Sequence, residues 1–291
     1  GADGVRVGIL LSSPAGNDLK FDTPLDIEKE GLESKLCEQG RNFCNKIWNA
    51  LRLVKGWETG DGELSNQHHL ALNWIGNRIE SAKAELAEHF AKFRISDGLM
   101  LVYKLIWDDF CSWFLEMMKP GKGESLPEVA YEQVISYFET LMQVAHPFIP
   151  FLTEEVWQQL RPRENGEALM VTEFPATKGY NAELLDEFAF VQDAITELRA
   201  FRAKYGLKNK EQIELFVNSP QPETFRKYTQ VLETFLNTSQ IAFTDQAPEG
   251  AGSTQVRTTE FYIPLPEIDV EAEIAKLNKE IAYTEGFLQK V

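Results

Sequence analysis

The stretch RNFCNKIWNALR, residues 41–52, has two distinct faces when its residues are placed at helical spacing. One face is apolar and contains Phe43, Cys44, Ile47, Trp48, Ala50 and Leu51. The other face carries amides and bases but no acid, namely Asn42, Asn45, Lys46, Asn49 and Arg52. Asparagine is a poor helix former because its short amide competes for backbone hydrogen bonds. Simple exposure to water therefore does not explain this face, and we expect it to meet a partner.

The composition limits what that partner can be. The chain has 45 acidic against 29 basic residues, and a formal net charge of -16 opposes non-specific binding to nucleic acids or membranes. No run of about 18 apolar residues is present, so we expect no membrane span. The start, GADGVRVGIL, lacks the features of a secretory signal. Cys37, Cys44 and Cys111 form no C-x-x-C pair, which favours reduced thiols of a cytoplasmic protein, and the four histidines show no metal-ligand spacing.

Helical patterns dominate the first 180 residues. A short helix over residues 1–13 precedes the break SPAGND and an irregular segment, 17–32. Four long helices are predicted over 33–55, 65–93, 96–119 and 127–145, and a short one at TEEVWQQL; Ser96 and Thr153 are the expected N-caps of the third and the last. Short connections favour an antiparallel bundle over 33–180, in which Trp48, Trp107, Trp113 and Trp157 pack between helices.

The pattern changes after Pro175. A helix over 186–205 leads to a strand at 213–219, a helix PETFRKYTQVLETFLN, and strands at QIAFTD and TQVRTTEFYIPL. We therefore expect a small α+β unit over 186–267. From Val270 the apolar residues approach heptad spacing, which predicts the start of a coiled-coil helix over 268–291. The fold class is mainly α.

Catalytic arrangements are not evident. Asp108 and Asp109 are adjacent on a helix and point about 100° apart, so they cannot share a substrate. The phosphate-binding and nucleophile-elbow motifs are missing. The chain is interpreted as a binding module; an enzyme with an unrecognised site and a helical scaffold that binds another protein remain alternatives.

Local charge favours RNA as the partner. Two segments are basic within an acidic chain: residues 35–56, which hold Lys35, Arg41, Lys46, Arg52 and Lys55, and residues 199–210, which include Arg199 and Arg202. Asparagine can donate to and accept from unpaired bases, while the cations meet phosphates. The strip Asn42, Lys46, Asn49, Leu53 follows one side of the helix and ends in an apolar candidate for base contact. Neutralisation of acidic neighbours, or hydrogen bonding of the asparagines between helices, would also account for these residues.

The order of motifs extends this interpretation. RNFCNKIWNALRLVKGW, LIWDDFCSWFLEMMKP, AHPFIPFLTEEVWQQL and FVQDAITELRAFRAKYGL resemble consecutive helices of the anticodon-binding domain in class I aminoacyl-tRNA synthetases of the valine, isoleucine and leucine group. SSPAGNDLKFD and EIDVEAEIAKLNKEI are similar to the valine-specific members, and isoleucine- and leucine-specific members are the alternative. Residues 1–32 then resemble the connector that follows the catalytic domain.

The resemblance implies a longer, monomeric parent enzyme that attaches valine to its tRNA with ATP and Mg²⁺. Neither ATP signature motif is in these 291 residues, so we expect this piece to bind the tRNA anticodon stem-loop, to need no cofactor and to lack ligase activity alone. The family pattern places Lys46, Asn49, Arg52 and Leu53 on the RNA-facing side, with Asn42 and Arg41 beside them and Arg199 and Arg202 as candidates for stem phosphates. Leu53 departs from members that have an aromatic residue there.

Overall fold

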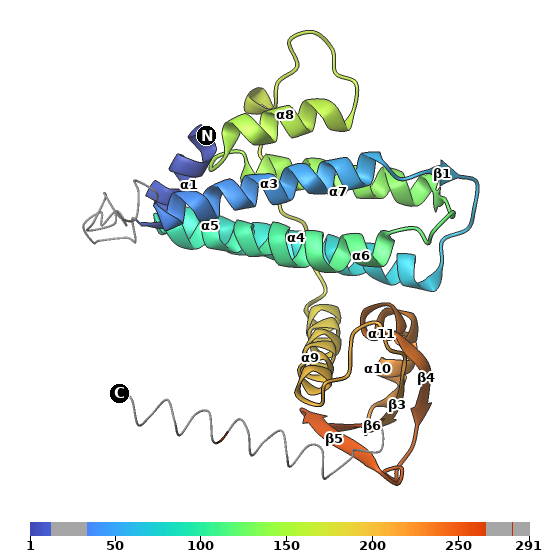
Figure 1. Cartoon of the computed structure of the whole chain (residues 1–291). Helices are drawn as coiled ribbons and strands as arrows, with labels where there is room; N and C mark the ends of the chain where they lie inside the picture. Colours follow the sequence, from blue (N-terminus) through green and yellow to red (C-terminus); the bar gives the residue numbers. More distant parts are fainter. Residues whose placement is uncertain (13–33, 266–280, 282–291) are drawn as a thin grey trace. The chain divides into compact units, whose positions relative to one another are not determined.

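The computed structural model describes residues 1–12, 34–265 and 281, and the chain divides into two compact units, Gly1–Phe188 and Ala189–Val291 (Figure 1). The irregular segment at 17–32 and nearly all of the predicted coiled-coil helix at 268–291 lie outside the described residues.

The first unit is a bundle whose long helices lie side by side along a common direction (Figure 1). Ser34 and Ser65 cap the first two long helices of the bundle by accepting hydrogen bonds from the amides of Cys37 (3.1 Å) and His68 (3.2 Å). The fully buried ring of Phe110 packs against the rings of Phe114 and Phe138, which are also fully buried. The four predicted long helices are confirmed as α3 (Lys35–Lys55), α4 (Asn66–Ala91), the run α5 (Ile95–Lys104), η1 (Leu105–Phe114) and α6 (Leu115–Met118), and α7 (Glu128–Ala145).

The third long helix differs from the prediction in two respects. Ser96 is not its N-cap: the helix begins at Ile95, and the Ser96 hydroxyl donates to the carbonyl of Leu10 at 2.5 Å, which ties it to the first helix of the chain. Residues 105–114 are also π-helical, with wider turns than an α-helix. The Ser112 hydroxyl donates to the carbonyl of Trp107 five residues earlier (2.9 Å), and this bond follows the wider repeat.

The predicted N-terminal helix is confirmed as α1 (Ala2–Leu11), and it packs very closely on α3. A Cβ atom on Gly40 would lie 2.7 Å from the carbonyl oxygen of Gly4, so both backbones meet without intervening side chains. The buried carboxylate of Asp3 accepts hydrogen bonds from the amides of Phe151 (3.4 Å) and Leu152 (2.7 Å). These amides are in the first turn of α8 (Pro150–Leu160), where a negative charge is favourable.

The start of α8 therefore corrects another expectation. Thr153 is not the N-cap of this helix but a buried residue within it, and its hydroxyl donates to the carbonyl of Ile149 at 2.8 Å. Pro150 occupies the first turn, where the missing N–H of proline costs nothing. The helix is consequently one turn longer than the pattern TEEVWQQL indicates. A short 3-10 turn, η2 (Leu169–Val171), follows it, and two-residue strands β1 (Thr59–Gly60) and β2 (Leu126–Pro127) pair between the bundle's loops.

The segment that leads out of the bundle is held by polar side chains of α4. The buried ammonium of Lys83 pairs with Glu80 (2.7 Å) and donates to the carbonyl of Ala176 (2.7 Å). Glu80 in turn accepts from the amide of Lys178 at 2.6 Å. One buried ion pair thus fixes the backbone just before α9 (Ala182–Lys204), which continues from the first unit into the second.

The second unit is the predicted α+β unit. Its sheet has the order β4–β3–β6–β5, with β3 parallel to β4 and antiparallel to β6. The predicted helix after the first strand is broken at the buried Tyr228 into two helices. The last predicted strand is instead a hairpin that turns at residues 257–258. The elements are β3 (Ile213–Asn218), α10 (Pro222–Lys227), α11 (Thr229–Leu236), β4 (Thr238–Phe243), β5 (Ala251–Val256) and β6 (Thr259–Pro264).

Among the described residues, no helix combines the length and the apolar character that crossing a membrane requires.

Candidate nucleic-acid interface

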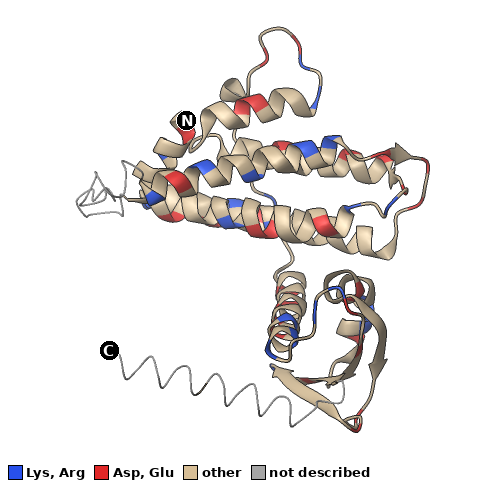
Figure 2. Cartoon of the chain, in the orientation of Figure 1, with Lys and Arg blue, Asp and Glu red and all other residues tan. Residues whose placement is uncertain are grey.

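Helix α3 presents the strip of amides and cations to solvent. On its apolar face Phe43, Ile47 and Val54 are fully buried in the bundle. Asn42, Asn49 and Arg52 are exposed, as the helical spacing predicts, and Leu53 keeps 41% of its surface exposed at the end of the strip. Figure 2 shows Lys and Arg recurring along α3. The acidic residue of its first turn is Glu38.

The asparagines of α3 have no hydrogen-bonding partner within the described part of the chain. The side chains of Asn42, Asn45 and Asn49 are all exposed, and none bonds to another described residue. The alternative explanation, hydrogen bonding between helices of the bundle, is therefore wrong for the described residues. Their donors and acceptors remain available to a ligand.

The cations of the strip differ in their surroundings. Arg41 forms an exposed ion pair with Glu38 at 2.9 Å, an interaction worth little in water. Arg52 and Lys55 are exposed and make no ion pair with any described residue. Two positive charges near the end of α3 are thus not neutralised locally, although they also complement the negative end of the helix.

Lys46 is half-buried, and an aromatic ring supports it. Its ammonium lies 5.3 Å from the ring centroid of Trp107, at cation–π distance. Burial raises the pKa of the Cys111 thiol to about 12, and the nearby positive charge of Lys46 opposes this shift. The sequence predicts that Trp107 packs between helices but does not connect it to Lys46, because spacing carries no signal for two residues 61 positions apart.

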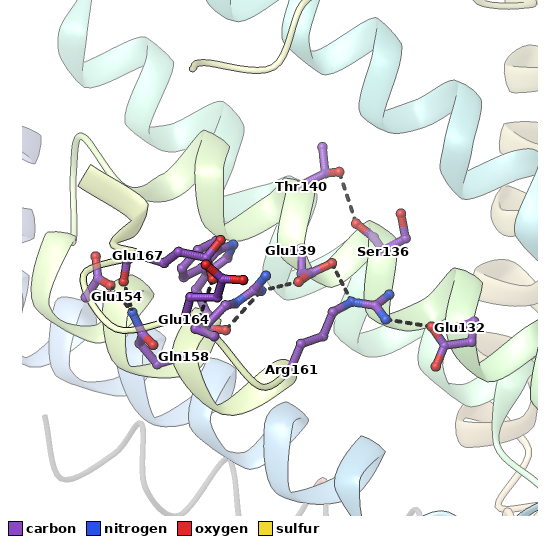
Figure 3. Close-up of polar contacts among 11 residues, drawn as sticks. Glu132, Ser136, Glu139, Thr140, Glu154, Gln158, Arg161, Glu164 and Glu167 are labelled. Carbon is purple, nitrogen blue, oxygen red and sulfur yellow. Dashed lines mark hydrogen bonds and ion pairs between the residues drawn. The ribbon is translucent and has the colours of Figure 1, made fainter. Parts of the chain in front are cut away.

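Basic residues elsewhere in the first unit show the contrasting, structural arrangement (Figure 3). Arg161 donates to Glu139 (3.0 Å) and Glu132 (2.6 Å), both on α7. Arg163 pairs with the same Glu139 and lies over the ring of Trp157, 3.5 Å from its centroid. These arginines are neutralised and hold the chain after α8 against α7. Arg161 and Arg163, which serve the fold, are thus paired with acids, whereas Lys46 and Arg52 of α3 form no ion pair with a described residue.

Arg202 is a correction to the predicted interface. It is only 1% exposed, and its guanidinium donates to the carbonyls of Leu236, Lys208 (2.5 Å) and Glu211 (2.7 Å). Burial lowers the pKa of this guanidinium. A side chain enclosed by backbone carbonyls cannot reach a phosphate, so the prediction of RNA binding by Arg202 is wrong.

Arg199 lies next to Arg202 and shares its role in part. It is exposed at the surface, yet its guanidinium donates to the carbonyl of Phe235 (2.9 and 3.2 Å) and lies over the Phe235 ring. Both arginines therefore satisfy carbonyls at the C-terminus of α11, where positive charge is favourable. They line a pocket of about 310 Å³ together with Asn209, Phe235 and Leu236.

No group of three potential metal ligands is present among residues 1–12, 34–265 and 281. The three cysteines are free and partly buried.

The chain is similar to known proteins over its whole length. The family described as "Anticodon-binding domain of tRNA ligase" matches residues 73–217. Valine–tRNA ligases of Bacteroides fragilis and Christiangramia forsetii are 46% and 43% identical over the whole chain, and that of Enterococcus faecalis is 31% identical over 97% of it. The chain belongs to the valine–tRNA ligase family. It spans 32% of the length of these relatives. The matched domain begins within α4, so α3 is covered by the relatives and not by the domain match.

Proposed function

We propose that this chain is the tRNA-binding part of an enzyme that joins valine to its tRNA, and that the α3 strip binds the unpaired anticodon loop. The observation that carries the proposal is a row of exposed polar groups on α3 beside Lys46, namely Asn42, Asn49 and Arg52, whose side chains have no partner among the described residues. The match to an anticodon-binding domain supports RNA as the partner, and the similarity to valine–tRNA ligases supports a valine-specific tRNA.

Each side-chain type has a definite task in this proposal. Arg52 and Lys46 meet phosphates of the loop, because their charges have no acidic partner in the described structure. Asn49 and Asn42 read the edges of unstacked bases, since an amide both donates and accepts. Leu53 provides an apolar contact smaller than the aromatic stacking surface that a base would prefer.

The chemistry of the ligase lies outside these residues in this proposal. ATP and Mg²⁺ would act where the two ATP signature motifs are, and neither motif occurs in the 291 residues. We therefore expect the chain alone to bind the stem-loop without attaching valine to tRNA, and to do so as a monomer in the cytoplasm. Its affinity should be modest, since the intact tRNA would be held by several contacts at once.

A salt titration of anticodon stem-loop binding tests the proposal. Fluorescence anisotropy of a labelled valine-specific stem-loop is measured between 0.1 and 0.4 M salt with the 291-residue chain. Arg52→Gln should reduce the slope of log K against log salt by about 0.7, the value for one single-stranded phosphate. Asn49→Ala should leave the slope unchanged and reduce the preference for the cognate loop over one with an altered anticodon.

Lys92→Gln is the matched control, because Lys92 is the exposed C-cap residue of α4 and is paired with Glu88. It should change neither slope nor preference. Unaltered binding by both the Arg52 and Asn49 variants would show that α3 is not the interface. If the wild-type chain does not bind the stem-loop even at 0.1 M salt, the result would favour the alternative that the chain is a helical scaffold that binds another protein.

A further inference from the structure

Trp107 belongs to an aromatic arrangement that links two turns of α3 to the facing helix. Its ring stacks on Tyr103, with centroids 5.4 Å apart and planes 10° apart. Tyr103 in turn packs against Phe43 at 4.8 Å. Phe43 and Lys46 are one turn apart on α3, and the ammonium group of Lys46 lies over the ring of Trp107. Four side chains thus close a ring of contacts between α3 and the segment 95–118.

This arrangement orients a cation without neutralising it. A lysine side chain has many rotamers, and ordering them opposes binding of a ligand. A carboxylate could hold Lys46 in place but would cancel the charge that a phosphate needs. An aromatic face attracts the ammonium and leaves its charge and its N–H donors available. Consistent with this, no carboxylate of the described residues forms an ion pair with Lys46.

We propose that Trp107 is a positioning residue for RNA binding: it holds the Lys46 ammonium over its ring so that the cation is already oriented when the anticodon loop arrives. The proposal rests on the proposed function of the α3 strip. Trp107 itself is not assigned a contact with RNA, because Tyr103 and Lys46 already lie against its ring.

The first test needs no RNA. Protons of the Lys46 side chain near its ammonium should show an upfield ring-current shift in the NMR spectrum of the wild-type chain. The shift should persist in Trp107→Phe, which keeps an aromatic face, and disappear in Trp107→Leu. Unshifted Lys46 protons in the wild-type chain would overturn the proposal.

The second test is a double-mutant cycle on stem-loop binding with Lys46→Met, Trp107→Leu and both together. Trp107→Leu should weaken binding about three- to tenfold in the wild-type background, the range expected for one cation–π contact. It should have no further effect once Lys46 is methionine, and Trp107→Phe should restore most of the loss. An equal loss in both backgrounds would show that Trp107 acts independently of Lys46 and would overturn the proposal.

Trp113→Leu is the matched control for damage to the fold. Trp113 is a half-buried tryptophan on the same π-helical segment, and its ring meets the edge of Phe188 at 6.2 Å. Its replacement should lower thermal stability without coupling to Lys46. Binding of the stem-loop by the wild-type chain with no Lys46–Trp107 coupling would refute the positioning role alone, whereas no binding by the wild-type chain would refute the proposed function and the positioning role with it.

Discussion

Replacing Arg202 by methionine separates a structural arginine from an RNA-binding one. The side chain is buried, and its guanidinium donates to three backbone carbonyls, those of Leu236, Lys208 and Glu211. Methionine fills similar volume but donates nothing, so three acceptors lose a charged partner.

The expected cost follows from the number of bonds. A hydrogen bond to a charged group contributes about 1.5–3 kcal/mol. Three such bonds are offset in part by the cost of removing a guanidinium from water, which is several kcal/mol. We therefore expect Arg202→Met to lower the free energy of unfolding of the second unit by about 3 kcal/mol. For a unit of this size that corresponds to a melting temperature lower by about 12–24 °C.

The assay uses the uneven distribution of tryptophan. All 6 tryptophans precede residue 189, so tryptophan fluorescence follows the first unit and should be unchanged. Amide hydrogen exchange of β3 and β6 follows the second unit and should accelerate. Arg199→Met is the control, since the guanidinium of Arg199 is exposed to solvent whereas that of Arg202 is buried, and it should cost about 1 kcal/mol. Unchanged exchange in Arg202→Met, together with a smaller salt slope for stem-loop binding, would refute the reasoning and restore Arg202 as a phosphate ligand.

Three further predictions concern the first unit. Lys83→Met should lower the free energy of unfolding by about 3 kcal/mol, because it removes a buried ammonium and leaves the half-buried carboxylate of Glu80 without its charged partner. Lys92→Met breaks an exposed ion pair and should cost about 0.5 kcal/mol or less. Urea denaturation followed by tryptophan fluorescence measures both variants. Gly40→Ala should cost about 1–3 kcal/mol in the same assay, since its Cβ would lie 2.7 Å from the backbone of α1, and an unchanged midpoint would show that α1 and α3 can separate freely. Burial raises the pKa of Cys111 from 9.0 to about 12 and that of Cys44 to about 11, so alkylation by iodoacetamide at pH 8 should be about 1000-fold slower for Cys111 and about 100-fold slower for Cys44 than in urea. The contribution of these thiols to the free energy of unfolding is fully present below pH 9 and should be lost as the pH rises toward the raised pKa values. Equal alkylation rates in native and unfolded chains would contradict this prediction.

Helical periodicity and helix-breaking residues such as proline and glycine are sufficient to predict where the bundle's helices lie, but not how each helix begins. Ser34 and Ser65 cap helices, whereas Ser96 and Thr153 lie inside them and bond to other carbonyls. A hydroxyl in the first turn can serve either purpose, and the choice depends on what packs beside it. In the case of Ser96 that neighbour is the carbonyl of Leu10, 86 residues away in the sequence.

The hairpin of β5 and β6 was missed for a different reason. Two-residue hairpin turns usually contain Asn-Gly or Asp-Gly, because a positive φ is needed. Here Arg257 takes φ of 52° and Thr258 follows it, so the local sequence has no turn signal. Arg257 also lies over the ring of Phe190 (4.8 Å) and 3.7 Å from Asp193, contacts with α9 that hold it in place. Tertiary contacts decide this turn, and they cannot be predicted from the local sequence.

The candidate site divides in the same way. Spacing alone predicted correctly that Asn42, Asn49 and Arg52 face outward, since the apolar residues of α3 fix which side is buried. Whether a polar side chain already bonds to another part of the protein depends on residues far along the chain. The guanidinium of Arg202 donates to the carbonyl of Leu236 at the end of α11, 34 residues later, and Lys46 lies over the ring of Trp107, 61 residues later.

An acidic chain that binds RNA needs cations concentrated on one surface, and the net charge explains why the α3 strip has to be local. The repulsion from a net charge of -16 acts over the Debye length, about 30 Å at 0.01 M salt but about 8 Å at 0.15 M. If RNA binds as we propose, a phosphate at the strip would interact with Lys46 and Arg52 at physiological salt, while the acids on distant surfaces would be screened. At very low salt those acids oppose the same phosphate, which is why the number of phosphate contacts is best measured above 0.1 M. The proposal therefore implies that an RNA loop prefers the α3 strip to Arg161 and Arg163, because the charges of these two arginines are neutralised by Glu132 and Glu139 of α7.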